Sequence, residues 1–231
     1  MSYLVKNAVA LLSSGLDSSL ALNAAIRQGI TVELALTFNY GQRAANAEIE
    51  HSKAITEHFS IPHQVVELPW VKQFTSGLTQ SEGKVPSPNP QDLDDLKASQ
   101  ASAKAVWVPN RNGLLIEVAA GFAESLGCEG VIVGFNKEEA ATFPDNSVEY
   151  LEAITNALTY STANRVQVIS PTARMDKRDI VKSAVEWKFP LSLIWSCYYN
   201  DQTMCGECES CQRLKRALNH HGVLSDVDFK N

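Results

Sequence analysis

Ser13-Ser14-Gly15-Leu16-Asp17-Ser18 directly follows the apolar run at residues 8–12, and this junction indicates the class of fold. The apolar run predicts a buried strand, and the Ser/Gly bend predicts a tight turn into a helix that ends at Gly29. In an open parallel sheet, ligands bind at the carboxyl ends of the strands, where a helix N-terminus offers free N–H groups to an anion. The stretch therefore predicts a loop that binds phosphate.

Strands and helices alternate along the rest of the chain. Strand-like runs cover residues 32–38, 65–66, 131–133 and 166–169, and helical patterns cover residues 48–59, 114–126 and the segment after Asp176, its expected N-cap. Regular alternation predicts an α/β protein with a doubly wound parallel sheet and helices on both faces. We assign residues 1–195 to this domain and residues 196–231 to a C-terminal segment packed on it.

The composition is that of an ordinary folded chain. Of the 231 residues, 45% are apolar and 20% are charged, and the formal net charge is −6. These values argue against a disordered or fibrous chain, and the negative charge gives no broad basic face for nucleic acid. No apolar run approaches the roughly 20 residues that cross a bilayer, and the first residues lack the pattern of a signal peptide. We expect a cytoplasmic protein without a membrane partner or direct nucleic-acid binding.

Residues 13–18 form what we call the serine loop. Its side chains suit a pyrophosphate with a bound cation. Gly15 lets the backbone approach a ligand closely, and the hydroxyls of Ser13 and Ser18 can donate to phosphate oxygens. The Asp17 carboxylate is repelled by a polyphosphate unless a cation lies between them, so we predict that it helps to hold Mg²⁺, directly or through water. The loop has neither the Gly-Lys-Ser ending of Walker A nor the G-x-G-x-x-G pattern, which disfavours kinases and dehydrogenases.

Four cysteines near the C-terminus form a pattern typical of a metal site. Cys197, Cys205, Cys208 and Cys211 follow the spacing C-x7-C-x2-C-x2-C, and Gly206 allows a tight turn after the second of them. Four thiolates with short spacings suit a tetrahedral Zn²⁺, and a site filled by protein ligands has no open position for catalysis. We predict a structural zinc ion, with an iron–sulfur cluster as the alternative that uses the same ligands.

A stretch at about residues 70–107 is too long for a plain connector in a compact domain. It contains Gly77, Gly83, Pro86, Pro88 and Pro90. Long loops often carry function, so we predict a lid or mobile insertion. A surface excursion without function is the alternative.

Further motifs follow the serine loop in order. They are Tyr40-Gly41-Gln42-Arg43, Val108-Pro109-Asn110-Arg111-Asn112, Gly134-Phe135-Asn136, Pro144-Asp145, Lys177-x-x-Ile180 and Ser196-Cys197-Tyr198. The loop resembles the S-G-G-x-D-S pyrophosphate loop, or PP-loop, of the N-type ATP pyrophosphatases. From the first strand to the last cysteine, the ordered set resembles one family of that superfamily, the 7-cyano-7-deazaguanine synthases.

The chain departs from the family pattern at three places. Ser14 stands where the loop motif has Gly. Ala44 follows Arg43 where many members carry His, and the next acidic residue, Glu48, is shifted by one position. The run Ala141-Thr142-Phe143-Pro144-Asp145-Asn146-Ser147 replaces a block like S-G-Y-P-D-C-R. The last two departures fall where the acceptor, rather than the nucleotide, is handled.

The resemblance implies a Rossmann-like fold of the adenine nucleotide alpha hydrolase type and an ATP-dependent carbon–nitrogen ligase of queuosine biosynthesis. In that family, ATP converts 7-carboxy-7-deazaguanine to an acyl adenylate, and ammonia displaces AMP to give the amide. A second ATP then activates the amide oxygen, and elimination yields 7-cyano-7-deazaguanine. We also expect a homodimer, because exposed sheet edges and the C-terminal segment that the metal holds together leave surfaces for a second copy.

The resemblance also implies roles for individual residues. The ATP-binding residues are Leu12, Ser13, Ser14, Gly15, Leu16, Asp17, Ser18 and Arg43; the catalytic residues are Asp17, Arg111 and Lys177; the substrate-binding residues are Tyr40, Asn112, Asn136, Phe143 and Asp145. Arg43, Arg111 and Lys177 are cations suited to charge that builds on phosphorus, with surface salt bridges as their alternative. The Asp145 carboxylate suits the aminopyrimidine edge, with a simple Pro-Asp turn as its alternative. Asn112 fits a helix N-cap equally well.

Two other functions fit the same motifs. A relative of the family could adenylate the same deazaguanine acid and join it as an amide to another amine, such as a protein N-terminus. A tRNA thiolase or a nucleotide-binding scaffold is a third interpretation. Thiolation is disfavoured because the clustered cysteines are metal ligands, which leaves only Cys128 to carry sulfur.

Overall fold

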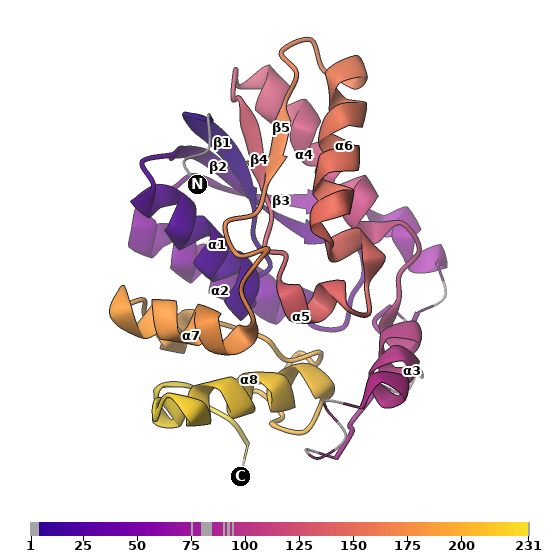
Figure 1. Ribbon diagram of the computed structural model, residues 1–231, viewed down its shortest axis with the longest axis vertical. Coiled ribbons are helices and arrows are strands. Elements are labelled where there is room, and N and C mark those ends of the chain that lie inside the picture. The colour runs from indigo at the N-terminus through magenta and orange to yellow at the C-terminus, as the bar shows by residue number, and fades with distance from the viewer. Residues whose placement is uncertain are drawn as a thin grey trace.

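A five-stranded parallel sheet forms the centre of the protein, which is described here from a computed structural model (Figure 1). The structure describes residues 5–74, 76–79, 85–89, 91, 93 and 95–230. The strands are β1 (Asn7–Leu11), β2 (Thr31–Asn39), β3 (His63–Glu67), β4 (Gly130–Ile132) and β5 (Gln167–Ile169). Their order is β3-β2-β1-β4-β5, and every neighbouring pair is parallel. The predicted doubly wound parallel sheet is confirmed.

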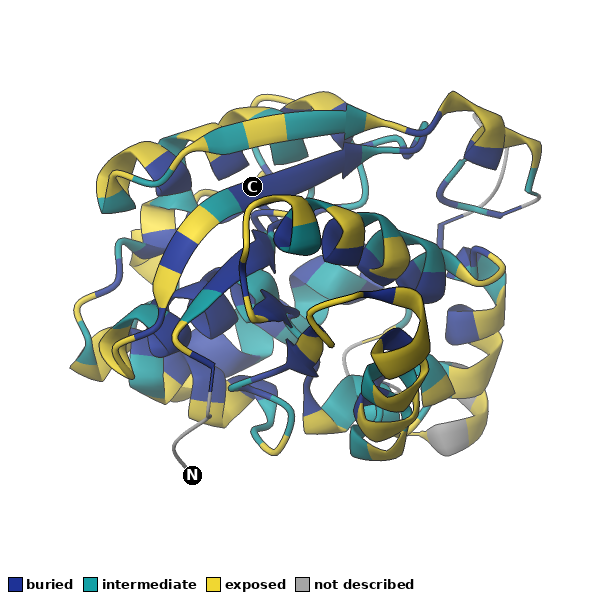
Figure 2. Cartoon of the chain, turned by 90° about the horizontal axis from the view of Figure 1, so that it is seen from above, coloured by how far each residue is buried: buried dark blue, intermediate teal, exposed yellow. Residues whose placement is uncertain are grey.

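Helices cover both faces of this sheet. The helices α1 (Leu16–Arg27), α2 (Ala45–Phe59) and α7 (Lys177–Glu186) lie on one face, and α4 (Arg111–Ser125) and α6 (Val148–Ser161) lie on the other (Figure 1). Side chains alternate along β1, so Ala8 and Ala10 join the core under α1 while Val9 joins the core under α4. Figure 2 shows the buried sheet between helices whose outer faces are exposed.

The helix ends follow local chemistry. Gly29 follows the C-cap of α1 with a φ angle of 86°, so the expected stop signal is present, and Gly127 follows the C-cap of α4 in the same way with a φ angle of 68°. Asp176 caps α7 as expected, since its side chain accepts a hydrogen bond from the backbone nitrogen of Asp179. Asn112 is not an N-cap: α4 begins at Arg111, and Asn110 is the N-cap.

The C-terminal segment and part of the stretch at residues 70–107 lie against each other. The segment contains α8 (Glu209–His220), which packs on α7, and the stretch contains α3 (Leu96–Val106) (Figure 1). The backbone nitrogen of Glu209 donates to the carbonyl oxygen of Pro86 over 3.0 Å, and Arg213 donates to Ser99 Oγ over 3.2 Å. Gly83 and Pro90, which the sequence singled out, lie outside the described residues.

Each helix among the described residues falls short of the length or apolar character that a bilayer crossing needs.

Candidate active site

The site lies at the carboxyl edge of the sheet, where the strand order reverses. From β1 the chain adds β2 and β3 on one side, and β4 and β5 fill the other side. The loops that follow β1 and β4 therefore flank the point at which open α/β sheets bind ligands. A cavity of about 280 Å³ opens there, lined by residues from both loops.

Gly134 brings these two loops into contact. A Cβ atom at this position would lie 2.4 Å from the backbone nitrogen and Cα of Ser18. Only glycine lets the chain after β4 approach the first turn of α1 this closely. Gly134 thereby sets the distance between two loops that line the cavity.

The serine loop has a left-handed bend at Ser14. Its φ angle is 57°, a conformation that favours glycine, which accounts for the glycine in the family motif at this place. The Ser14 hydroxyl is buried and donates to the carbonyl oxygen of Ser13 over 2.6 Å. Because the side chain turns back on its own loop, serine replaces glycine here without filling the cavity.

The hydroxyls of Ser13 and Ser18 lie at the cavity wall. Their Oγ atoms are 3.1 Å apart, and the Ser18 Oγ also accepts from the backbone nitrogen of Ser13 over 3.3 Å. Gly15 is the N-cap of α1, so the N–H groups of the first helical turn have no partner within the helix, and Asp17 and Ser18 of that turn line the same cavity. The loop therefore offers hydroxyl and backbone donors together, an arrangement suited to an anion.

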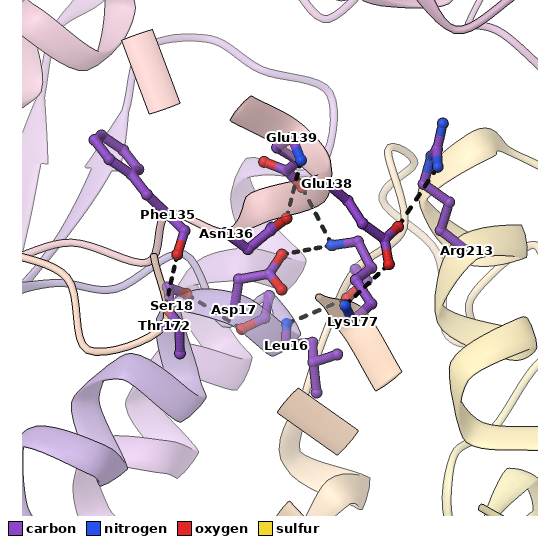
Figure 3. A network of polar contacts seen from close by, with 12 residues as sticks. Leu16, Asp17, Ser18, Phe135, Asn136, Glu138, Glu139, Thr172, Lys177 and Arg213 are labelled. Atoms are coloured by element: carbon purple, nitrogen blue, oxygen red, sulfur yellow. Dashed lines mark hydrogen bonds and ion pairs between the residues drawn. The ribbon is translucent and has the colours of Figure 1, made fainter. Parts of the chain in front are cut away.

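A buried ion-pair network joins the serine loop to α7 and α5 (Lys137–Ala140) (Figure 3). Lys177 Nζ lies 2.6 Å from Asp17 Oδ2 and 3.2 Å from Glu139 Oε1. Burial disfavours the charge on Lys177, but Asp17 and Glu139 outweigh that effect and raise the pKa of the ammonium above its ordinary value. The same carboxylates hold Lys177 in place as a fixed cation on the cavity wall.

Asp17 is a carboxyl group of this network whose ionised form is disfavoured by burial. Burial raises the pKa of Asp17 to about 6, although Lys177 acts in the opposite direction. Its second oxygen, Oδ1, is buried and has no hydrogen-bond partner among the described residues. An orphaned carboxylate oxygen beside an anion-binding loop fits a cation ligand.

Glu138 and Glu139 were missed by the sequence analysis. Glu138 accepts from the backbone nitrogen of Lys177 over 3.0 Å, and its other oxygen lies 3.6 Å from Arg213 Nη1 and 3.5 Å from Arg216 Nη2 (Figure 3). It therefore ties α5 to both α7 and α8. Their position in the sequence could have indicated a role. Two adjacent acidic residues follow a strand of a parallel sheet and lie at the same edge as the serine loop.

A second group of polar side chains lies on the opposite wall of the cavity. The Asn112 amide donates to the carbonyl oxygen of Asp145 over 3.3 Å, and Arg111 Nε donates to Asn112 Oδ1 over 3.3 Å. Burial opposes the charge on Arg111, but Tyr40, Asp145 and Glu139 together raise its pKa above the ordinary value. Burial raises the pKa of Asp145, and Arg111 partly offsets that effect.

Two aromatic rings stand beside this polar group. The rings of Trp107 and Phe143 are 6.1 Å apart between centroids and only 9° from parallel, and both line the cavity. Parallel aromatic faces suit a planar heterocycle. Trp107 was missed by the sequence analysis because nothing in its local pattern shows that it meets Phe143.

Most of the predicted site residues meet in this one cavity. Its lining includes Leu12, Ser13, Gly15, Leu16, Asp17, Ser18, Tyr40, Arg43, Arg111, Asn112, Phe143, Asp145 and Lys177. Ser14 and Asn136 do not line it. The Asn136 Oδ1 accepts from the backbone nitrogen of Glu139 over 2.9 Å, so this side chain caps α5 and sets the position of Glu139.

The four cysteines of the C-terminal segment meet at one point. Their Sγ atoms lie within 4.8 Å of one another, and those of Cys205 and Cys211 are 3.8 Å apart. A tetrahedral ion with metal–sulfur bonds of about 2.3 Å needs sulfurs separated by roughly 3.8 Å. Backbone nitrogens of Tyr199 and Cys208 donate to sulfur over 3.4 and 3.3 Å, which favours thiolates. These residues can hold a metal ion, and Gly206 turns the chain between ligands with φ at 74°.

Comparison with known proteins gives consistent matches. The family described as queuosine biosynthesis protein QueC matches residues 7–222. A relative from Desulforamulus reducens named 7-cyano-7-deazaguanine synthase is 50% identical over 96% of this chain and 98% of the relative. One of the same name from Bdellovibrio bacteriovorus is 52% identical over 98% of this chain and 96% of the relative. The solved structure of NMN synthetase from Francisella tularensis has a TM-score of 0.48 and 14% identity, over 96% of this chain and 88% of that chain.

Proposed function

The chain belongs to the QueC family, and from this we propose that it is a 7-cyano-7-deazaguanine synthase that converts 7-carboxy-7-deazaguanine to the nitrile. The observation that carries the proposal is the composition of the cavity at the carboxyl edge of the sheet. One wall offers donors and a fixed cation to a triphosphate, and the other offers parallel rings and a carboxylate to a planar aminopyrimidine. ATP and the deazaguanine acid would thus meet between the two walls.

We assign the serine loop to ATP. The donors of Ser13, Ser18 and the first turn of α1 would bind the phosphates, together with Arg43, which also lines the cavity. Lys177 and Arg111 would stabilise the charge that develops when the acid's oxygen attacks the innermost phosphorus and pyrophosphate leaves. Asp17 Oδ1 fits a Mg²⁺ ligand because it is buried and without a partner among the described residues. When bound with ATP, Mg²⁺ would neutralise charge on the phosphates.

We assign the opposite wall to the deazaguanine. Trp107 and Phe143 would contact its rings, and the Asp145 carboxylate would accept from adjacent N–H groups of the aminopyrimidine edge. Tyr40 and Asn112 complete this wall. Asn136 would act indirectly, by positioning Glu139, rather than by contact with the substrate.

We propose zinc as the ion of the four cysteines. Protein thiolates fill all four positions of a tetrahedron, so the ion would stabilise the segment and would not bind substrate. The described part of residues 70–107 contacts both this segment, through Ser99, and the cavity, through Trp107. We propose that this stretch covers the deazaguanine side of the cavity.

Ammonia is the proposed nitrogen donor, and a homodimer the proposed assembly. Transfer to another amine is not favoured, because the relatives that match nearly the full chain are named for the nitrile product. Thiolation is disfavoured by the structure as well, since Cys128 is fully buried and no sulfur acceptor can reach its thiol.

The test is product analysis with the purified protein. Incubation with 7-carboxy-7-deazaguanine, ATP, Mg²⁺ and ammonia should release pyrophosphate only when the acid is present, and mass spectrometry should detect the nitrile. AMP release with an amide conjugate and no nitrile would support the other acceptor. Pyrophosphate release that does not depend on the acid, or the absence of any pyrophosphate release, would refute the proposed function.

A further inference from the structure

Glu48 projects into the cavity from the first turn of α2 and is held there by a fixed amide. Gln42 Nε2 donates to Glu48 Oε2 over 2.7 Å and to the carbonyl oxygen of Phe38 over 2.8 Å. Gln42 Oε1 accepts from the backbone nitrogen of Tyr40 over 3.0 Å. Because Gln42 is buried and bonded through both of its amide atoms, it holds one oxygen of Glu48 in a defined place.

Glu48 differs from the other carboxyl groups of the cavity in its partners. Asp17 and Glu139 both contact the ammonium of Lys177, and Asp145 accepts from the Asn146 amide and faces Arg111. The hydrogen-bond partner of Glu48 is the neutral amide of Gln42, and the described part of the chain gives it no ion pair.

The surroundings of Glu48 suit a group that exchanges protons near neutral pH. Burial raises its pKa to about 7, although Gln42 and Arg111 act in the opposite direction. The titratable groups that face it are Arg111 from α4 and Tyr40 from the end of β2. A carboxyl with a pKa near the working pH is an efficient general base, whereas the paired Asp17 is committed to Lys177.

The proposed reaction needs such a base. When ammonia attacks the acyl adenylate, a C–N bond forms, the C–O bond to AMP breaks, and nitrogen loses one proton. Attack of the amide oxygen on the second ATP expels pyrophosphate and releases one N–H proton, which leaves an O-adenylated imidate. Loss of its last N–H proton forms the C≡N bond as the C–O bond breaks and AMP departs. No oxidant or reductant enters any step.

On the basis of the proposed function, we propose that Glu48 is a catalytic residue that takes the N–H proton as the O-adenylated imidate collapses to the nitrile. Gln42 orients its carboxylate toward the reacting nitrogen. Both residues line the cavity, and Arg111 is close enough to act on the pKa of Glu48. The proton transfer thus uses a carboxyl group other than those that hold the ammonium of Lys177.

Glu48→Gln tests this role, because the amide keeps the hydrogen bond from Gln42 and cannot act as a base. With the deazaguanine acid, ATP and Mg²⁺ but no ammonia, the variant should release pyrophosphate within about threefold of the wild-type rate. With the deazaguanine amide as substrate, nitrile formation should fall by about 100-fold or more. The wild-type rate should decline below about pH 7, and this decline should be absent from the residual rate of the variant. Glu48→Asp should restore part of the rate.

Asp145→Asn is the matched control, because Asp145 is another carboxyl group that lines the same cavity. This variant should raise KM for the acid and keep the decline below about pH 7. Nitrile formation by Glu48→Gln at the wild-type rate would overturn the proposal. Equal loss of adenylation and nitrile formation in a variant shown by circular dichroism to be folded would also overturn it, because Glu48 would then bind substrate. If the wild-type protein releases no acid-dependent pyrophosphate, the proposed function itself fails.

Discussion

The backbone nitrogen of Leu16 lies 3.4 Å from the hydroxyl oxygen of Ser196, although the two residues are 180 positions apart in the chain. Next to this contact, the backbone nitrogen of Trp195 donates to the carbonyl oxygen of Ser14 over 2.9 Å. Cys197, the first cysteine of the cluster, follows directly. The segment that can hold a metal therefore supports the serine loop, and Ser196 lines the same cavity.

Removal of the metal should weaken ATP binding as well as stability. Without the ion, the segment that begins at Cys197 loses its anchor, and the contacts of Trp195 and Ser196 with the loop are released with it. We expect the melting temperature to fall in Cys208→Ser and the Kd for ATP to rise at least tenfold, about 1.4 kcal/mol. Calorimetric titration with ATP, on protein shown by circular dichroism to be folded, measures the change.

Ser196→Ala separates the contact from the metal. The variant keeps all four cysteines, so metal content and melting temperature should stay close to those of the wild type. Its Kd for ATP should rise about threefold, because a single hydrogen bond contributes roughly 0.5–1.5 kcal/mol. If folded, metal-free protein binds ATP as tightly as the metal-bound protein, the proposed coupling between the metal and ATP binding is contradicted.

Gly134→Ala should displace the serine loop. The new Cβ would lie 2.4 Å from the backbone of Ser18, so either the loop or the chain after β4 must move. We expect a loss of about 1–3 kcal/mol in the free energy of unfolding and a weaker affinity for ATP. Urea unfolding and ATP titration measure the two effects.

Gly121→Ala is the control for that substitution. Gly121 lies inside α4 with no atom within 4 Å of an added Cβ, so alanine should stabilise the helix by up to about 1 kcal/mol. ATP affinity should not change. Equal stability and equal affinity in both variants would show that the close approach at Gly134 has no role.

Local sequence patterns predicted the sheet well because strands and turns depend on nearby residues. The run at 8–12, the bend at Ser14 and the stop at Gly29 each act over a few positions, and the four cysteines lie within one short segment. The contact of Ser196 with Leu16 is different, since it exists only after the two ends of the chain meet. Asn136 shows the same limit: its side chain caps α5, a contact that its motif alone does not reveal.

Lys177→Met should destabilise the protein strongly at alkaline pH. The change leaves the carboxylates of Asp17 and Glu139 buried without their cation, a situation that costs about 3–5 kcal/mol. The pKa of Asp17, already raised to about 6, should rise further without Lys177. A raised carboxyl pKa favours the folded state at low pH. The loss of stability caused by Lys177→Met should therefore be smaller at pH 5 than at pH 8.

Lys182→Met is the matched control on the same helix. Lys182 lies 3.8 Å from Glu186 in an exposed pair, and such pairs contribute about 0.3–0.5 kcal/mol. Its substitution should change the free energy of unfolding little and almost independently of pH. A loss in Lys177→Met that is as small as in Lys182→Met would show that the buried network is not a stabilising element.

Glu48→Gln should increase stability at alkaline pH while it removes the proposed base. In the folded state the pKa of Glu48 is raised from 4.5 to about 7, so the folded protein binds a proton that the unfolded chain releases. The resulting stabilisation is fully present below pH 4.5 and is lost as the pH rises through about 7, where the buried carboxylate must ionise. At about 1.4 kcal/mol per pKa unit, the loss amounts to about 3.5 kcal/mol. Glutamine never ionises, so urea unfolding should show the variant more stable than the wild type at pH 8, with a difference that narrows toward pH 5. A difference that does not depend on pH would mean that Glu48 stays ionised in the folded protein.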